Sequence, residues 1–421
     1  MLNNATPLFL YIYGPKRYHM STDKQKNGIL GTLLAAFATR SVINTSNRFI
    51  YPFAPVISRG LGVPLTAVTS VIALNQATAL IGVFTSSIGD RTGYKRMMLA
   101  GLVSLILGMV LVGFLPLYLS FVVAMFLSGL GKNFFDPAIQ AYVGTRVSYK
   151  KRGLVVGILE ISWSVATLAG IPLVGFIISK MGWQAPFLVL AGLGVICLGL
   201  VSVYIKDDSQ VAQISEVPET ANKFKTLIKS MAPLLKHPRA LGAMGFAFFV
   251  SFANDNLFVI YGAWLENLFN FSVVDLGLGT AVIGVGELCG SVGTALLADR
   301  FGLKRSVCCG VLLSGLSYLL VPMSEFSMWA ALGSLFLIFF MFEFTIVSLI
   351  SMCTELIPGS RATMMSLFFG AAGLGRVAGA FYGGMVWHGL GMNVVCYSSF
   401  VFSLAGLVCL LWGTKNWIPE Q

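Results

Sequence analysis

Long hydrophobic runs alternate with short polar strings along most of the chain. A helix that crosses a bilayer needs about 20 apolar residues. Bounded by charges, glycines and prolines, the runs predict twelve spans, at residues 29–56, 65–88, 97–115, 117–143, 153–179, 184–205, 240–264, 275–298, 306–324, 327–352, 363–387 and 393–414. The pattern therefore predicts an all-α membrane protein with twelve transmembrane helices.

One polar string occurs twice along the chain. DRTGYKR begins at Asp90 and DRFGLKR begins at Asp299, a displacement of 209 residues. The same displacement relates four further pairs of identical residues: Thr145 and Thr354, Arg152 and Arg361, Gly170 and Gly379, and Gly175 and Gly384. Because the register holds from the second to the fifth span and only two copies occur, we expect two pseudo-symmetric six-helix halves in parallel orientation.

The spans and the repeat divide the chain into five parts. We expect a cytoplasmic N-terminal segment at 1–28, a six-helix half at 29–205, a linker at 206–239, a second half at 240–414 and a tail at 415–421. In the linker, NKFKTLIKSMAPLLK places apolar residues at helical spacing with lysines between them. Such an amphipathic helix suits either the inner leaflet of the membrane or the protein's own cytoplasmic face.

Composition and charge agree with a membrane protein. Charged residues make up 11% of the chain, against about 25% in soluble proteins. Of the 28 lysines and arginines, 22 fall in connections on one side of the predicted spans, and only Arg59 and Lys180 fall on the other. The positive-inside rule then places both termini and the linker in the cytoplasm. The net charge of +11 is therefore a topology signal, and we expect a lipid bilayer and no nucleic acid as partner.

Nine ionisable residues lie inside the predicted spans, where each would cost about 2.5–3.5 kcal/mol at the bilayer centre. They are Arg40, Arg48, Lys132, Asp136, Glu160, Asp255, Glu287, Glu343 and Arg376. They fall in spans one, four, five, seven, eight, ten and eleven, and spans three, six, nine and twelve hold none. Because this cost forbids exposure to lipid, we expect these side chains to face one another or a hydrated cavity.

The spacing of the polar residues indicates candidate roles. Arg40, Asn44 and Arg48 recur every four residues and are predicted to form one helix stripe, and Lys132 and Asp136 are predicted to pair on one face. A carboxyl group in a low-dielectric cavity can accept and release protons, so the candidate proton carriers are Asp255, Glu343, Glu160 and Asp136. The candidates for a substrate cavity are Arg40, Asn44, Arg48, Lys132, Asn254, Asn256, Glu287 and Arg376.

Each of these residues also has a structural interpretation. Lys132 and Asp136 could form a static pair, and the Arg48 side chain could only extend to the outer surface. Glu287 and Arg376 could link helices without contacting a substrate. The functional interpretation is stronger for Asp255 and Glu343, because neither has a partner on its own helix.

The doubled string resembles the loop signature of the major facilitator superfamily, G-x-x-x-D-R-x-G-[RK]-[RK], which lies between spans two and three and again between spans eight and nine. The matching residues here are Asp90, Arg91, Gly93, Lys95 and Arg96, and then Asp299, Arg300, Gly302, Lys304 and Arg305. Ser86 and Ala295 stand where the signature begins with glycine. The resemblance implies that helices one, four, seven and ten line a central cavity and that the doubled string is a conformational latch.

Two further stretches are similar to exporters of that superfamily. GIPLVG, from Gly170 to Gly175, is similar to the G-P-x-x-G-G element of drug:proton antiporters, with Ile171 inserted and Phe176 in place of the last glycine. The run that begins GLGKNFFDP looks like the bacterial branch described as predicted arabinose-efflux permeases. The resemblance implies proton-coupled efflux of a small organic solute across a bacterial inner membrane.

Other functions remain open at this point. Proton-coupled uptake of a small polar metabolite would use the same machinery, while a non-transporting membrane sensor would not need polar residues in both halves. An enzyme is not expected, because no acid–histidine cluster, serine-nucleophile motif or phosphate loop occurs. The seven cysteines lie in apolar runs without metal-ligand spacing, so we expect no metal or cofactor, and we expect a monomer.

Overall fold

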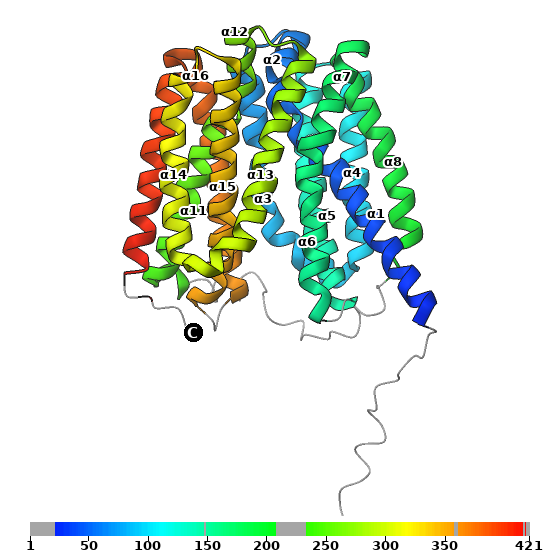
Figure 1. The fold of residues 1–421 in the computed structure, drawn as a ribbon. Coiled ribbons are helices and arrows are strands. Elements are labelled where there is room, and N and C mark those ends of the chain that lie inside the picture. Colours follow the sequence, from blue (N-terminus) through cyan, green and yellow to red (C-terminus); the bar gives the residue numbers. More distant parts are fainter. Residues whose placement is uncertain (1–21, 147–148, 208–232, 358–360, 416, 418–421) are drawn as a thin grey trace, which may run out of the picture.

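The computed structural model describes residues 22–146, 149–207, 233–357, 361–415 and 417 (Figure 1). Within these segments the side chains of residues 22–29, 82–91, 144–146, 149–154, 156, 299, 361 and 362 are not described. The amphipathic helix predicted in the linker falls mostly in 208–232 and so lies outside the described residues. Its last residues form a 3₁₀ turn, η2 (Leu234–Lys236).

Each half of the chain crosses the bundle six times. The N-terminal half contains α1 (Thr22–Arg48) with α2 (Ile50–Leu61), then α3 (Leu65–Thr92), α4 (Tyr94–Phe114), α5 (Tyr118–Arg146), then α6 (Tyr149–Val165) with the π-helical turn η1 (Ala166–Gly170) and α7 (Ile171–Met181), and α8 (Ala185–Tyr204). The C-terminal half contains α11 (Pro238–Phe258) with α12 (Tyr261–Phe269), then α13 (Val273–Phe301), α14 (Leu303–Met323), α15 (Met328–Leu356) and α16 (Arg361–Gly413). Gly391, at φ 78°, breaks α16 into the last two spans.

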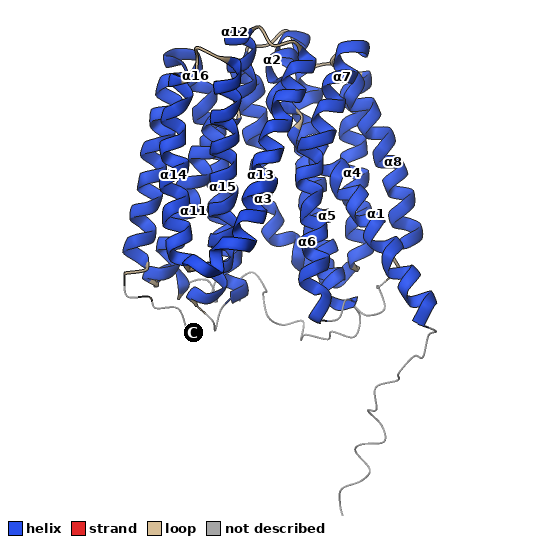
Figure 2. Ribbon diagram, in the orientation of Figure 1, coloured by secondary structure: helices blue, strands red, loops and turns tan. Residues whose placement is uncertain are grey.

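The predicted fold class is confirmed. All regular structure in the described residues is helical (Figure 2), and nine of these helices are long and apolar enough to cross a membrane. One of the nine is the 51-residue stretch of α16, which crosses twice. The predicted boundaries are correct to within several residues, except that the first span continues through α2 to Leu61 and the seventh through α12 to Phe269.

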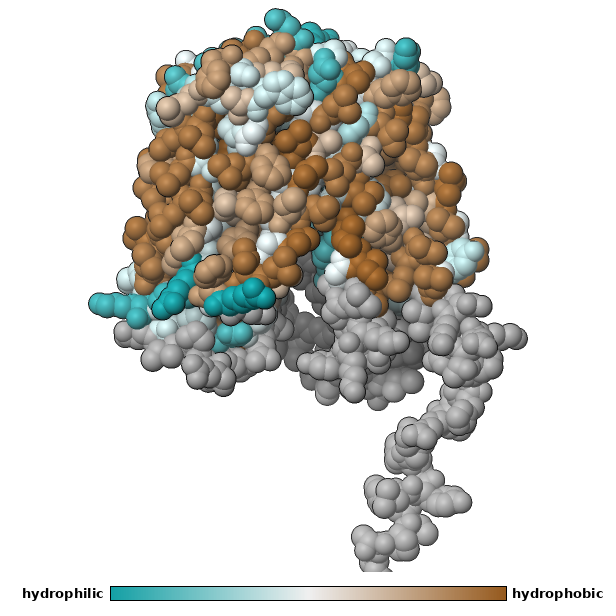
Figure 3. Space-filling view, viewed as in Figure 1, coloured by the Kyte–Doolittle hydropathy of each residue, from teal (hydrophilic) through white to brown (hydrophobic). Residues whose placement is uncertain are grey.

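The two halves stand side by side and meet at one end of the bundle. We call the end where α1 begins and α16 ends the terminal face, and the opposite end, where α2 and α12 lie, the closed face (Figure 1). Hydrophobic side chains form a broad band across the visible face of the molecule, and a hollow between the halves opens toward the terminal face (Figure 3). The structure is therefore sealed on one side and open on the other.

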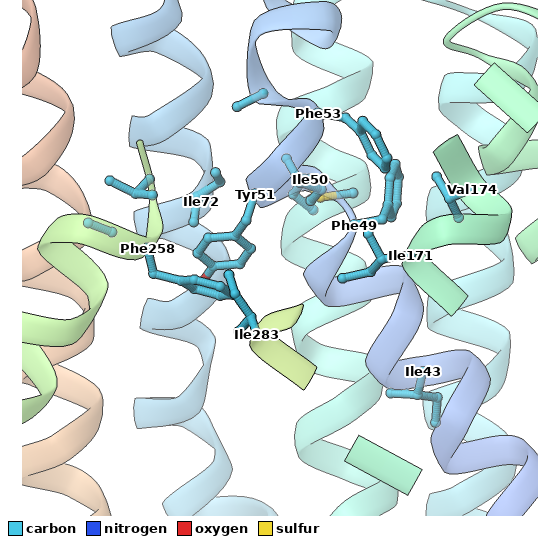
Figure 4. Close-up of a cluster of buried hydrophobic side chains, with 14 of the residues drawn as sticks. Ile43, Phe49, Ile50, Tyr51, Phe53, Ile72, Ile171, Val174, Phe258 and Ile283 are labelled. Atoms are coloured by element: carbon cyan, nitrogen blue, oxygen red, sulfur yellow. The ribbon is translucent and has the colours of Figure 1, made fainter. Parts of the chain in front are cut away.

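Close packing between the halves seals the closed face. The α7 and α13 helices approach so closely that a Cβ atom added at Gly277 would lie 3.1 Å from the Cα atom of Pro172. The rings of Tyr51 in α2 and Phe258 in α11 have centroids 4.4 Å apart, and Ile283 of α13 lies in the same buried cluster (Figure 4). This packing excludes water from the closed side of the interface.

The first helix of each half is broken at the same place in the repeat. α1 gives way to α2 between Arg48 and Ile50, and α11 gives way to α12 between Phe258 and Tyr261. In the first break, Pro52 has no N–H to donate to the carbonyl oxygen of Arg48 four residues earlier. The second break contains no proline. Both halves therefore share the bend, but the proline that explains it occurs only in the first half.

Candidate functional site

Five polar side chains of the N-terminal half form one network, which we call the N-half cluster. Arg40 of α1 contacts Asp136 of α5 at 3.1 Å and Glu160 of α6 at 2.9 Å. Lys132 lies 3.0 Å from the same Asp136 and donates to the side-chain oxygen of Asn44 at 2.5 Å. Two cations thus face two carboxylates, and the cluster is electrically balanced.

The N-half cluster confirms two local predictions. Arg40 and Asn44 project from one face of α1, as their four-residue spacing indicated, and Arg48 continues that stripe into the interface between the halves. Lys132 and Asp136 form the predicted pair within α5. Arg40 is only 4% exposed, so its two carboxylate partners replace the water that its guanidinium loses.

Arg48 forms an ion pair across the two halves. Its guanidinium contacts Glu287 of α13 through two bonds, at 2.6 and 3.0 Å, and also donates to the Thr167 hydroxyl at 2.7 Å. Arg48 and Glu287 are 5% and 4% exposed. The alternative in which Arg48 only extends to the outer surface is therefore wrong, because a buried carboxylate holds it in a planar, two-point contact.

Trp163 supports this ion pair with its indole ring. The guanidinium carbon of Arg48 lies 4.3 Å from the ring centroid, and the Lys132 ammonium lies 4.8 Å from it. An aromatic face attracts cations within about 6 Å. Trp163 therefore connects the N-half cluster to the pair between the halves, a role that neither its spacing nor its residue type revealed in the sequence.

The π-helical turn η1 places Thr167 beside Arg48. Pro172 cannot donate to the carbonyl oxygen of Leu168, so the ordinary helical ladder is interrupted here. A π turn widens the helix locally and is common at functional sites. Gly170 completes the turn against α1, because a Cβ atom there would collide with the Thr45 side chain. The proline of the GIPLVG stretch thus accounts for the interruption, while the π turn itself was not predicted.

Asp255 of α11 lies where the C-terminal half meets the N-terminal half. Its carboxylate is 3.7 Å from the Arg376 guanidinium of α16 and is only 2% exposed as a residue. Across the boundary, Tyr51 interacts electrostatically with Asp255 and accepts a hydrogen bond from Gln76 at 2.5 Å. The pair is longer than the others in the interior, so a small movement of α16 is enough to separate it.

The two asparagines beside Asp255 differ in their surroundings. Asn256 is fully buried and donates to α16 at three oxygens, those of the Val395 carbonyl, Ser398 and Ser399, at 2.9–3.0 Å. These contacts hold α11 against α16, and Asn256 stays a candidate for the substrate cavity. The side-chain oxygens of both asparagines are buried without a hydrogen-bond partner among the described residues, but no side-chain donation to a neighbouring helix is seen for Asn254 comparable to that of Asn256.

Glu343 of α15 differs from every other ionisable residue of the interior. It accepts a hydrogen bond from Ser291 of α13 at 3.0 Å, and no basic side chain among the described residues lies within ion-pair distance of it. Gly290 makes the room it occupies, because a Cβ atom there would lie 2.9 Å from the Cβ atom of Glu343. A carboxyl group is thus held in the interior with no cation to balance it.

Three glycines of α16 pack directly on the backbone of α11. Gly375, Gly379 and Gly383 recur every four residues, so they form one stripe on the helix. A Cβ atom on each would collide with a main-chain carbonyl oxygen, those of Phe248, Phe252 and Asn256 respectively. The glycine stripe therefore permits close approach of α16 to α11, the helix that carries Asp255.

The doubled loop string shows a different arrangement in its described part. Gly93 and Gly302 have φ values of 93° and 83°, a conformation that residues with a Cβ atom rarely adopt, at the start of α4 and α14. Lys95 donates to the carbonyl oxygen of Ser202 at 2.6 Å, and Lys304 to that of Thr414 at 2.7 Å. Each lysine thus holds the end of the sixth span of its own half.

The latch interpretation of this string is not tested by these contacts. The side chains of Asp90, Arg91 and Asp299 lie outside the described residues, and Arg96, Arg300 and Arg305 are exposed at the terminal face. The lysine contacts lie within each half and not between the halves. The string therefore fixes the chain direction after spans two and eight, and its role in conformational change remains a proposal.

A sealed end, an open end and a charged interior between two parallel six-helix halves define a membrane transporter. The model of the Major Facilitator Superfamily matches residues 29–244 and again residues 243–420. The chain belongs to this family, and it is a multi-pass secondary transporter and not an enzyme.

Several proteins of known family resemble the chain along most of its length. The uncharacterized MFS-type transporter YwfA of Bacillus subtilis is 25% identical over 91% of this chain and 93% of its own. The multidrug resistance protein MdtG of Salmonella arizonae is 24% identical over 71% of this chain and 73% of its own. A probable sugar efflux transporter of Pasteurella multocida is 25% identical over 68% of each chain.

A solved structure supports the fold. The bacterial homologue of the human lysosomal transporter Spinster, in an inward-facing and unoccupied conformation, superposes with a TM-score of 0.69 at 14% identity, covering 94% of this chain and 96% of that one. At this identity the likeness shows the fold alone.

Proposed function

We propose that this protein exports a small organic solute in exchange for protons by alternating access. The observation that carries the proposal is Glu343, a carboxyl group in the interior with no cationic partner among the described residues. An uncompensated carboxylate in a low-dielectric interior is costly, and a bound proton removes that cost. Glu343 can therefore take up and release a proton as its access to water alternates.

The remaining carboxyl groups have graded roles in this scheme. Asp255 is the second proton carrier, because its contact with Arg376 is long and lies at the boundary between the halves. Glu160 and Asp136 are the weaker candidates, since Arg40 and Lys132 already compensate them. The N-half cluster instead supplies fixed polar groups on the wall of the cavity.

Contacts at the closed face supply the switch between conformations. Arg48 with Glu287 lies deep in the interface, and Arg59 of α2 with Glu266 of α12 lies at its rim, at 2.6 Å. Opening this side requires both ion pairs to separate. The contacts that form as the terminal face closes must compensate for the free energy lost when they separate. The doubled loop string, at the terminal face, is the proposed latch of the opposite state.

The terminal face is proposed to be cytoplasmic. The described basic residues Lys95, Arg96, Arg300, Lys304 and Arg305 lie at this face, and the positive-inside rule assigns such residues to the cytoplasm. We therefore propose a monomer in the bacterial inner membrane with both termini in the cytoplasm, in contact with lipid along its apolar band.

The direction of transport is proposed from the names of relatives. One is a multidrug resistance protein and another a probable sugar efflux transporter. The alternative is proton-coupled uptake of a small polar metabolite. It is favoured by the Glu160 side chain, which is 52% exposed and so accessible to a polar solute.

Transport into proteoliposomes of both orientations tests the proposal. A compound panel is offered under an imposed pH gradient, and accumulation should require an excess of protons on the side where the solute accumulates, because an antiporter moves protons and solute in opposite directions. Asp255→Asn and Glu343→Gln should abolish gradient-driven accumulation while retaining some solute binding or exchange. Glu325→Gln, at an exposed carboxyl in the connection after α14, is the matched control and should transport like the parent. If both interior variants still concentrate solute like the parent, the proton-carrier assignment is wrong.

A further inference from the structure

Two hydrogen-bond acceptors without sufficient partners lie beneath one aromatic contact in the C-terminal half. The rings of Phe258 in α11 and Phe339 in α15 meet with centroids 5.1 Å apart. Asn254 precedes Phe258 by four residues, and Glu343 follows Phe339 by four. Because α11 runs toward the closed face and α15 away from it, both residues lie one helical turn nearer the terminal face, on the helix faces that meet.

Both residues offer oxygen atoms that are not fully hydrogen-bonded, although Glu343 has one donor and the Asn254 side chain also interacts with Asp255. Asn254 is 5% exposed, and its side-chain oxygen has no hydrogen-bond partner. Glu343 has the Ser291 hydroxyl as its only hydrogen-bond donor among the described residues. A buried acceptor left without a donor is costly. The arrangement therefore calls for a group that brings N–H donors.

The charges of the interior call for the same group. The N-half cluster pairs two cations with two carboxylates, Arg48 pairs with Glu287, and Arg376 pairs with Asp255. The charged groups that act on Glu343 are Glu287, Arg48 and Arg376, and all three belong to these pairs. One positive charge is therefore missing from the interior, and the place where it is missing is Glu343.

The aromatic surroundings suit a cation. Phe258 stacks on Tyr261 with an interplanar angle of 9° and lies against Tyr51. It already faces the Arg48 guanidinium, whose carbon is 5.2 Å from the ring centroid. Aromatic faces attract ammonium groups in the same way. An organic cation beside Glu343 would thus be held by charge and by hydrogen bonds, next to a cluster of aromatic rings that already accommodates one cation.

We propose that Glu343, Asn254 and the rings of Phe258 and Phe339 form a binding site for an organic ammonium ion. This inference rests on the proposed function and names its substrate class. The ammonium group donates to the carboxylate of Glu343 and to the side-chain oxygen of Asn254. Because a proton on Glu343 removes the charge that the ammonium needs, substrate and proton occupy the site in turn, which is the exchange that an antiporter requires.

Binding to the purified full-length protein in detergent tests the site. Three probes share one ring and differ in charge: 2-phenylethylamine, 2-phenylethanol and phenylacetate. The amine should raise the unfolding temperature and release protons into a weakly buffered solution that contains a pH indicator. The alcohol and the carboxylate should do neither. An equal response to the alcohol would overturn the proposal, and this comparison needs no variant to fold.

Variants locate the binding to these residues. Glu343→Gln and Asn254→Val should each weaken amine binding about ten-fold or more, since each removes a charge or an acceptor. Proton release should vanish in Glu343→Gln and persist in Asn254→Val. Glu325→Gln should bind like the parent. Amine binding unchanged in both interior variants would place the amine elsewhere and contradict the site.

The same preparations separate this inference from the proposed function. If Glu343→Gln abolishes gradient-driven transport while the parent binds no amine, the antiporter stands and its substrate is not an ammonium ion. If the parent binds the amine through Glu343 but no pH gradient drives its transport, the site stands and the proton-coupled mechanism fails.

Discussion

The two halves share a scaffold but differ in their interiors. In the N-terminal half, two cations and two carboxylates bind one another across α1, α5 and α6. In the C-terminal half, a glycine stripe packs α16 on α11, aromatic rings fill the neighbouring space, and Glu343 has no cation beside it among the described residues. The N-half cluster is compensated within itself. Among the described interior residues, the C-terminal half has three carboxyl groups and one cation, and Arg48 of the other half pairs with one of the carboxylates, so one positive charge is still missing.

The difference shows which features of the sequence repeat occur in both halves and which occur in only one. Three features recur in both halves at the displacement of 209 residues. They are the helix break in the first span at Phe49 and Phe258, the positive-φ glycine at Gly93 and Gly302, and the loop lysine at Lys95 and Lys304. These features fix backbone direction, which both halves need. The charged interior side chains do not recur, although buried polar and aromatic residues such as Asn47 and Asn256 do. The charges therefore belong to what differs between the halves.

Removal of the shared carboxylate in the N-half cluster should have the largest effect on stability. Asp136→Ala leaves Lys132 without its carboxylate and Arg40 with only Glu160, which should lower the free energy of unfolding by about 3–5 kcal/mol. Glu343→Gln removes an uncompensated charge and should leave the free energy of unfolding unchanged or higher. Thermal unfolding in detergent measures both, and equal losses would contradict the contrast between the halves.

Substitution of a packed glycine should distinguish the two halves next. Gly379→Ala places a Cβ atom against the carbonyl oxygen of Phe252, which cannot move without moving α11, so we expect a loss of about 1–3 kcal/mol. Gly170→Ala, at the equivalent position, meets only the Thr45 side chain and should cost less. Gly389→Ala in α16 has nothing within 4 Å and is the control. A larger loss at Gly170 would refute the assignment.

The loop glycines should respond equally in both halves. Gly93→Ala and Gly302→Ala each force a Cβ-bearing residue to a positive φ, which should cost about 1–2 kcal/mol of unfolding free energy. Gly199→Ala, in α8 with open space around it, should be neutral or stabilising. Unequal losses would show that the repeat has diverged in its scaffold as well, and unfolding midpoints of the three variants provide the measurement.

The rim pair between the halves should have the smallest effect. The Arg59 side chain is 62% exposed, so its contact with Glu266 should contribute at most about 1 kcal/mol. Arg59→Gln, Glu266→Gln and the double variant form a thermodynamic cycle in unfolding measurements. A coupling energy well above that value would mean that the rim, and not the buried Arg48 pair, holds the closed face together.

The sequence by itself determined the number of spans, the repeat and the residues that must avoid lipid. It also determined the pairs that one helix can make alone, such as Lys132 with Asp136, because four residues along a helix return to the same face. The breaks near Phe49 and in η1 follow from prolines, so they were within reach of sequence reasoning, although the π turn was not predicted.

Only the tertiary structure decided which charges meet across helices. Arg48 pairs with Glu287 and Arg40 with Asp136 because helix rotation and depth bring them together, and these depend on glycine contacts such as Gly277 against Pro172. The sequence pattern predicts on which face of its helix a residue lies. It does not predict at which depth in the bundle a neighbouring helix contacts that face. For the same reason, Glu343 became recognisable as the uncompensated carboxyl only when every other charge had found its partner.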